Sequence, residues 1–308
     1  MSFTILVIKR LAKLGLSSFK EHYLAVQLTM SAGSFKDGSN STIITDLAMS
    51  VSVEKLGPPD FAKASVEIYG MELGTIEHLT SLAFNPLKVR RNYINIFAGD
   101  NPNDLSQIFA GSITEANGAL SGPEMVLKIS AEVGFWGRVD AKGPVTLNAP
   151  QSLSSFVEGQ AELAELSFVN EGVDTQLING TFSGSPIEKA RQAAYQAGAD
   201  LVIDDNEVIL LPKNGNRQGN GPLINSESGL LDSPSIGGDG ISFKCIYNPA
   251  LRFAGLFKLE SVIPKASGIW RVVKLTHKLQ CNMPSDAAWE SEVTGYYPHL
   301  SGEIGKFI

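Results

Sequence analysis

The chain has 308 residues, of which 43% are hydrophobic and 19% charged, and its formal net charge is −7. This length exceeds what one hydrophobic core comfortably organises, so two or three domains are expected, and the composition is that of an ordinary folded protein. No apolar run approaches the roughly 20 residues of a membrane-spanning helix. The acidic balance argues against a protein that binds nucleic acid by neutralising phosphates, so we expect neither sequence-specific nucleic-acid binding nor stable membrane association.

Residues 1–20 read MSFTILVIKRLAKLGLSSFK and carry basic side chains but no acidic one. This composition suggests an arm that docks on a partner or on a membrane surface, and an ordinary first strand or short helix explains it equally. The charges interrupt the apolar stretch, which argues against a signal peptide.

Residues 1–149, this arm included, are predicted to form a first β domain. Their hydrophobic residues mostly recur with a period of two, which indicates half-buried strands, and GTIEHLTSL has the three-residue spacing of a short helix. The loops are short and rich in turn residues, as in an antiparallel sheet that closes on itself. The predicted strands are YLAVQLTM, LAMSVSVEK, ASVEIYGM, NYINIFAG, QIFAGSITEA and EMVLKISAE.

Residues 150–217 are predicted to form a small α/β domain. After a helical segment, SLSSFVEGQAELAEL, a second helix is expected over 186–197. Ser185 is its N-cap, Glu188 completes a capping box, and Gly198 supplies a left-handed stop. LVIDDNEVILL then predicts two short strands around a tight turn, and NGNRQGNGP is interpreted as a linker because it lacks the spacing and lysine of a phosphate-binding loop.

Residues 218–308 return to the period of two and are predicted to form a second β domain. Cys245 alternates with large apolar residues and is expected to pack as a small hydrophobe. With no CxxC motif, Cys245 and Cys281 are predicted to be reduced thiols, and a disulfide between neighbouring strands is the alternative. The triplet Phe-Ala-Gly at 109–111 returns at 253–255 and suggests a duplicated β unit.

The stretch 271–297 carries His277, Glu290 and Glu292, which raises the question of an active site. A lone histidine on an apolar strand face is more often structural than catalytic, because general-base work needs an orienting partner and a cleft. Simple alternation places His277 on one face with Ile269, Arg271, Val273, Leu275 and Leu279.

Glu290 and Glu292 point the same way on a strand, about 6 to 7 Å apart, so a glycosidase pair is conceivable. A solvated strand face is the favoured interpretation. The four histidines are scattered, with no HExxH and no Cys or His pair at ligand spacing. We therefore expect no catalytic residue, no metal and no cofactor.

The order of several segments resembles the baseplate hub proteins of contractile-tailed phages, a group that includes late control D proteins and the N-terminal part of type VI secretion spike proteins. The similar segments cover roughly residues 20–297. They are ASVEIYGMELGTIEHLTSL, INIFAGDNPNDLSQIFAGSITEANGALSGPEMVLKISAEVG, FSGSPIEKARQAAYQAGADLVIDDNEVILLP and YNPALRFAGLFKLESVIPKASGIWRVVKLTHKLQCNMPSDAAWESEVTGYY.

The resemblance implies a mainly β protein with two tube-like antiparallel β-barrel domains that flank the small α/β domain. It also implies a non-enzymatic virion protein of the tail baseplate, made in the bacterial host cytoplasm. Three copies would form a ring that joins a six-fold tail tube to a three-fold central spike. The implied partners are a tail tube or distal tube protein, the spike and the tape measure protein, and DNA would pass through the ring.

Two other functions are considered. One is a peptidoglycan hydrolase that uses Glu290 or Glu292. The other is a carbohydrate-binding or adhesion module, for which Trp136, Trp289 or Tyr296 would have to line a groove.

The sequence PHLSGEIGKFI ends on two large apolar residues, Phe307 and Ile308. Leaving them in water would forgo roughly 1.5 to 3 kcal/mol each relative to burial. We therefore expect both to dock, either on this chain's own β domain or on a partner, and they are the candidate partner-binding residues.

Overall fold

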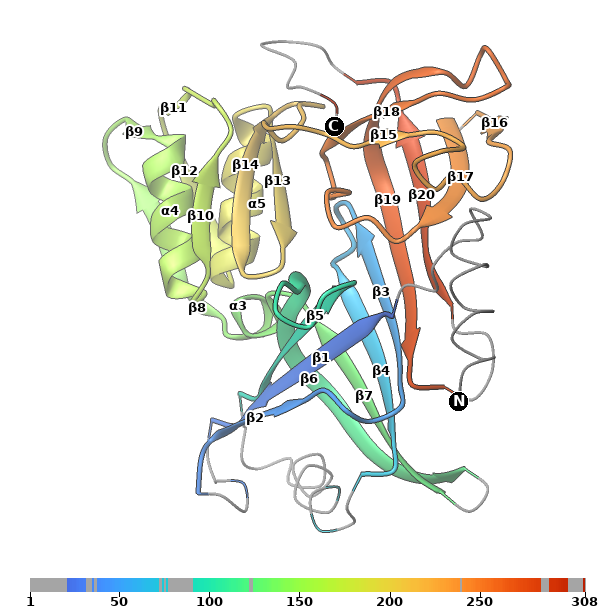
Figure 1. Cartoon of the computed structure of the whole chain (residues 1–308). Coiled ribbons are helices and arrows are strands. Elements are labelled where there is room, and N and C mark those ends of the chain that lie inside the picture. The colour runs from blue at the N-terminus through green and yellow to red at the C-terminus, as the bar shows by residue number, and fades with distance from the viewer. Residues whose placement is uncertain are drawn as a thin grey trace, which may run out of the picture.

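Figure 1 shows the computed structural model of the chain, which is mainly β. The predicted short helix at GTIEHLTSL lies mostly outside the described residues, and so do the arm at 1–20 and Ile308. The structure describes residues 21–31, 35, 38–71, 74, 76, 91–121, 124–238, 240–283, 288–298 and 307.

One 13-stranded sheet runs through most of the molecule in the order β16-β17-β20-β19-β3-β4-β7-β6-β5-β1-β2, with β18 and β15 attached beside β19. Strands make up 51% of the described residues and helices 12%, so the prediction of a mainly β fold is confirmed. The two separate barrels are not confirmed. No closed barrel forms among the described strands, because the strands of the two β regions pair with each other instead.

The N-terminal part of this sheet contains the first unit, defined as β3 to β7, and two further strands. Residues with even and odd numbers face opposite sides, so each strand has one buried and one half-exposed face. The strands are β1 (Tyr23–Thr29), β2 (Ser41–Ile44), β3 (Met49–Leu56), β4 (Lys63–Tyr69), β5 (Tyr93–Gly99), β6 (Ser106–Ser121) and β7 (Glu124–Glu132).

The C-terminal part contains the second unit, defined as β16 to β20. A short strand, β15 (Leu223–Ile224), pairs in parallel with β18. The unit comprises β16 (Ser235–Gly237), β17 (Gly240–Ile246), β18 (Leu256–Leu259), β19 (Gly268–Cys281) and β20 (Trp289–Tyr296).

The two units have the same strand order. In the first unit the order across the sheet is β3-β4-β7-β6-β5, and in the second it is β16-β17-β20-β19-β18, so the strands correspond one to one in chain order. The chain therefore contains a repeated five-stranded unit. The Phe-Ala-Gly triplets do not mark it, because 109–111 lie within β6 whereas 253–255 precede β18, which corresponds to β5.

Strand β19 joins the two units (Figure 1). Its residues 268–271 pair with β18 of its own unit, and residues 274–281 pair on the same side with β3 of the first unit. A bulge at Val273 separates the two parts in the pairing with β20. The bulge also corrects the predicted face of this strand, because Trp270 and Val272 are buried before it while Leu275, His277 and Leu279 are buried after it.

The α/β segment, from β8 to β14, lies to one side of the large sheet (Figure 1). Its helix α5 confirms the predicted capping box, since Ser185 Oγ accepts the Glu188 N–H and Glu188 Oε2 accepts the Ser185 N–H. The short helix α3 (Phe135–Val139) leads into it. The segment contains β8 (Lys142–Leu147), β9 (Gln151–Ser152), α4 (Leu153–Leu163), β10 (Ser167–Asn170), β11 (Gln176–Leu177), β12 (Gly180–Gly184), α5 (Pro186–Gln196), β13 (Ala199–Asp204) and β14 (Glu207–Pro212).

Three apolar clusters hold these parts together. The largest combines the first unit with the α/β segment, and a second fills the C-terminal unit. A smaller third cluster packs Val202, Ile209 and Leu211 of the α/β segment against Phe253 and Ala254. The α/β segment is thus anchored to both β regions.

The two cysteines are separate, buried free thiols, so the alternative of a disulfide is wrong. Burial raises the pKa of the Cys245 thiol to about 12, with a smaller contribution from Glu290. Cys245 therefore packs as a small apolar side chain, as predicted.

Candidate functional site

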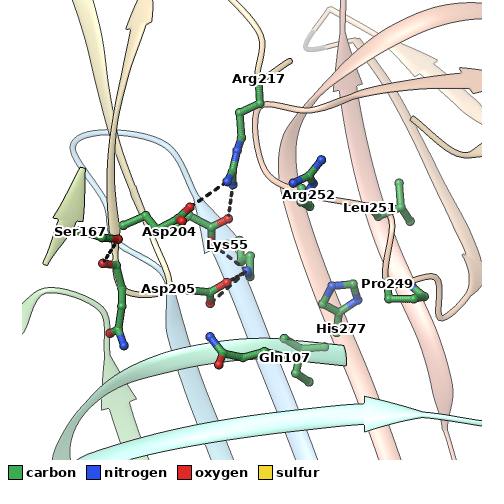
Figure 2. Close-up of a pocket in the computed structure, with 13 residues that line it drawn as sticks. Lys55, Gln107, Ser167, Asp204, Asp205, Arg217, Pro249, Leu251, Arg252 and His277 are labelled. Carbon is green, nitrogen blue, oxygen red and sulfur yellow. Dashed lines mark hydrogen bonds and ion pairs between the residues drawn. The ribbon is translucent and has the colours of Figure 1, made fainter. Parts of the chain in front are cut away.

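The most notable polar site is a cavity of about 360 Å³ where the first unit, the α/β segment and the C-terminal region meet (Figure 2). Each region contributes side chains that the sequence separates widely. The lining residues are Lys55, Gln107, Ile108, Ser167, Asp204, Asp205, Asn206, Glu207, Pro249, Leu251, Arg217, Arg252 and His277.

A network of ion pairs forms one wall of this cavity (Figure 2). Lys55 Nζ lies 2.7 Å from Asp204 Oδ1 and 3.2 Å from Asp205 Oδ2. The guanidinium of Arg217 donates to Asp204 Oδ2 at 2.9 Å and to Glu207 Oε2 at 3.1 Å. Lys55 and Asp204 are 5% and 3% exposed, so this is a buried network, which needs such pairing to offset the loss of water.

The pKa values in the network follow from burial and from the charge balance. Burial alone would lower the pKa of Lys55 and raise that of Asp204, but their mutual attraction outweighs it, so the pKa of Lys55 is raised and that of Asp204 lowered. Burial raises the pKa of Asp205 to about 6; Asp204 adds to this shift and Lys55 opposes it. The two cations, Lys55 and Arg217, both contact Asp204, whereas Asp205 contacts only Lys55 of the two. The negative charge of Asp205 is therefore less compensated than that of Asp204.

Asp205 also fixes the tip of the β13–β14 hairpin to the large sheet. It has a left-handed φ of 54°, and its Oδ1 accepts the Ala110 N–H of β6 at 3.2 Å. Asp and Asn tolerate this backbone region better than most side chains do, and they are common turn residues. The tight turn predicted between these strands is thus confirmed, with a tertiary role that local sequence does not show.

His277 is the structural residue that the sequence predicted. It is 2% exposed, its Nδ1 lies 2.8 Å from Ser291 Oγ, and its ring packs edge-on against Tyr247. Burial lowers the pKa of His277 to about 3, and the nearby Lys55 adds to the effect. Ser291 is 0% exposed, so the Ser–His contact presents no accessible nucleophile.

Glu290 and Glu292 lie on the half-exposed face of β20, as predicted. Lys244 Nζ lies 3.5 Å from Glu290 and 3.2 Å from Glu292, and Lys278 Nζ lies 2.8 Å from Glu292. Hydrogen bonding to Lys278 is the main reason that the pKa of Glu292 is lowered. The general acid of a glycosidase needs a raised pKa, so the lowered pKa of Glu292 is the opposite of what that role requires.

The aromatic residues of the carbohydrate-binding alternative do not form one surface. Trp289 is 7% exposed and stacks on His22 with 4.3 Å between ring centroids. Trp136 lines a separate pocket beside Tyr93, and Tyr296 is 47% exposed at the end of β20. The three therefore do not line a common groove.

Two observations concern metals and membranes. Among the described residues no group of three or more His, Cys, Asp or Glu side chains is placed to hold a metal ion. In the same part of the chain, no helix is long and apolar enough to cross a membrane.

A protein-family model described as "Baseplate hub gp41" matches residues 23–283. The chain belongs to this family. Membership places it in the virion, as a structural component of the phage tail baseplate, and favours a non-enzymatic role. The broad prediction of a phage baseplate protein is confirmed, but this family model does not show the narrower group of late control D and type VI spike proteins.

Solved structures of tail proteins share the fold at low sequence identity. The 43 kDa tail protein of prophage MuSo2 from Shewanella oneidensis is 10% identical, with 89% of this chain and 96% of that chain covered and a TM-score of 0.58. A tail protein from Neisseria meningitidis is 6% identical over 88% and 96% of the two chains, with a TM-score of 0.60.

A component of the Escherichia coli type VI secretion system has the same fold. It is 9% identical over 88% of this chain and 76% of that chain, with a TM-score of 0.54, and it is described as structurally similar to the T4 phage tail proteins gp27 and gp5. No protein with a curated description matches the chain in sequence.

The network residues Lys55, Asp204 and Arg217 were not predicted as site residues. Lys55 continues the buried face of β3, after Met49, Val51 and Val53, and a lysine at such a position is a signal that could have been used. Arg217 lies in the stretch interpreted as a linker and carries no local signal.

The raised pKa of Asp205 predicts a pH-dependent stability. Because the folded-state pKa of about 6 lies above the unfolded value near 3.9, Asp205 stabilises the fold while protonated, and this contribution is lost as the pH rises through about 6. D205N keeps the left-handed turn and cannot ionise. Relative to wild type, D205N should therefore gain about 1 to 3 kcal/mol of stability between pH 4 and pH 7, seen as a larger free energy of unfolding. Urea denaturation at both pH values measures this difference.

The matched control is D204N. The pKa of Asp204 is lowered, so its ionised form stabilises the fold at any pH above the unfolded value near 3.9. D204N should therefore be less stable than wild type at both pH 7 and pH 4, by nearly the same amount. Equal pH dependence of D205N and wild type would contradict the assigned role of Asp205.

Proposed function

We propose that three copies of this chain form a ring in the baseplate and join a six-fold tail tube to a three-fold central spike. The repeated five-stranded unit is the observation that carries this proposal. Three chains with two such units present six similar surfaces to a six-fold partner while keeping true three-fold symmetry for the spike. In this proposal the chain is a functional counterpart of late control D proteins and of the N-terminal hub of type VI spike proteins.

The partners follow from the position of such a ring. A tail tube or distal tube protein would bind one face and the spike the other, and the tape measure protein is a further candidate. The shared fold with a type VI secretion component that resembles two T4 tail proteins supports this assignment. The ring would let DNA pass without sequence-specific binding, and the protein would be made in the host cytoplasm before assembly.

The proposed ring makes a direct prediction of mass. Light scattering of the purified protein at high concentration should give three times the chain mass of 33.0 kDa, and a complex formed with the spike protein should contain three copies of this chain. A protein that stays monomeric at high concentration, even with the spike present, would contradict the ring.

The C-terminal residues Phe307 and Ile308 are proposed to contact the spike. Phe307 is half-buried and forms a parallel β-bridge with Gly221, close to β15. This bridge favours docking of Phe307 on its own chain, the other of the two alternatives for the tail. Its remaining exposed surface is available to a partner.

Deletion of residues 303–308 tests the proposed spike contact. If the tail serves the partner, the melting temperature of the isolated protein should change by no more than about 1 to 2 °C, because the bridge involves one residue pair, while capture of the spike in a pull-down weakens. A clearly lower melting temperature with normal capture would assign the tail to the chain's own core.

A further inference from the structure

The long strand of each unit pairs with the neighbouring short strand of that unit over only part of its length. In the second unit, β19 first pairs with its own β18 and then, after Val273, with β3 of the other unit. In the first unit, β6 pairs with its own β5 through residues 106–112. Beyond this point, no described strand pairs with the β5 side of β6, so residues 115–121 have a free edge.

The two long strands correspond residue by residue. The pairing of β6 with β7 skips Thr114, and the pairing of β19 with β20 skips Val273, so both bulges lie where the inner partner strand ends. An equivalent cross-strand ion pair also recurs with its charges exchanged. Lys128 lies 2.7 Å from Glu67 in the first unit, and Glu292 lies 3.2 Å from Lys244 at the matching position of the second.

The second free edge belongs to β16, which corresponds to β3. Within the chain, β3 fills the place beside residues 274–281 of β19, but on its outer side β16 pairs with no described strand. Its three residues, Ser235 to Gly237, carry no charge, and Ile236 is 50% exposed. Folded proteins usually protect such edges with charges, prolines or a covering segment, so an uncharged edge with an exposed isoleucine suits a partner strand.

We propose that β16 of one copy pairs antiparallel with residues 115–121 of β6 in the next copy, as β3 pairs with β19 within one chain. The proposal rests on the ring suggested above and names the contact that closes it. Each copy offers one β6 edge and one β16 edge, so the contact is head-to-tail and generates a closed ring when its rotation closes.

The intrachain pairing sets the register of this contact. His277 lies opposite Val53 and Lys278 opposite Ser52. When the two units are aligned on their bulges and on the pairing of β16 with β17, His277 corresponds to Gly118 and Lys278 to Ala119. In the same alignment Val53 corresponds to Ile236 and Ser52 to Ser235. The contact between copies would therefore place Gly118 opposite Ile236 and Ala119 opposite Ser235. The exposed isoleucine would then be covered at a position where the facing residue has no side chain.

A cysteine pair tests the register. Directly opposed Cα atoms in an antiparallel pair are about 4.5 to 5.5 Å apart, within the range that a disulfide bridges. The double variant A119C/S235C, oxidised in its assembled state, should give covalent dimers and trimers, with nothing larger, on a non-reducing gel. S65C/S235C is the matched control, because Ser65 is exposed on β4 away from the free edge, and it should give none. The native Cys245 and Cys281 are 0% and 4% exposed, and wild type measures their background.

Substitution of the edge residue gives a second, independent readout. I236K places a charge in the proposed contact and should shift the mass from trimer to monomer. I43K places the same charge on β2, the other end of the sheet, where Ile43 is 62% exposed, and should leave the trimer intact.

The outcomes separate this contact from the ring itself. A trimer by mass that gives no A119C/S235C cross-link and survives I236K overturns the strand pairing and leaves the ring. A cross-link within one monomer also overturns it. A protein that is monomeric throughout overturns both the ring and the pairing.

Discussion

The antiparallel pairing of β19 with β3 is the constraint on which the rest of the structure depends. It joins strands more than 200 residues apart in sequence and turns two repeated units into one sheet. The bulge at Val273 makes this possible, because it rotates the second part of β19 so that Leu275, His277 and Leu279 face the core.

The cavity with the buried ion-pair network lies beside this pairing. Lys55 lies opposite Leu275 in the pairing of β3 with β19. The lysine that forms ion pairs with Asp204 and Asp205 is therefore part of the contact between the two units. A buried ion network of this kind is weak evidence for stability, since well-packed apolar residues often stabilise as much. What the network does provide is a defined position for the β13–β14 hairpin, whose tip it holds against β6.

Local features of the fold could be predicted from sequence, and non-local ones could not. The capping box at Ser185 and Glu188 predicted α5, and alternation predicted most strands, because these signals lie within a few residues of each other. The single sheet depends on pairing between distant strands, and one extra residue at Val273 reversed the predicted face of the preceding residues. The structural role of His277 was predicted, but the ion network was not, since Arg217 gains its partners only when the linker folds back over the hairpin.

Hydrogen exchange in the paired segments of β19 and β3 tests most directly whether the two units form one cooperative sheet. If β19 and β3 hold both units in one cooperative sheet, amide groups in residues 49–56 and 274–281 should share the slowest exchange rate of the molecule and lose protection together as denaturant is added. Mass spectrometry of peptides from these two segments measures both rates in one experiment. Loss of protection in residues 49–56 at a denaturant concentration that leaves residues 274–281 protected would contradict the claim, because the two units would then unfold separately.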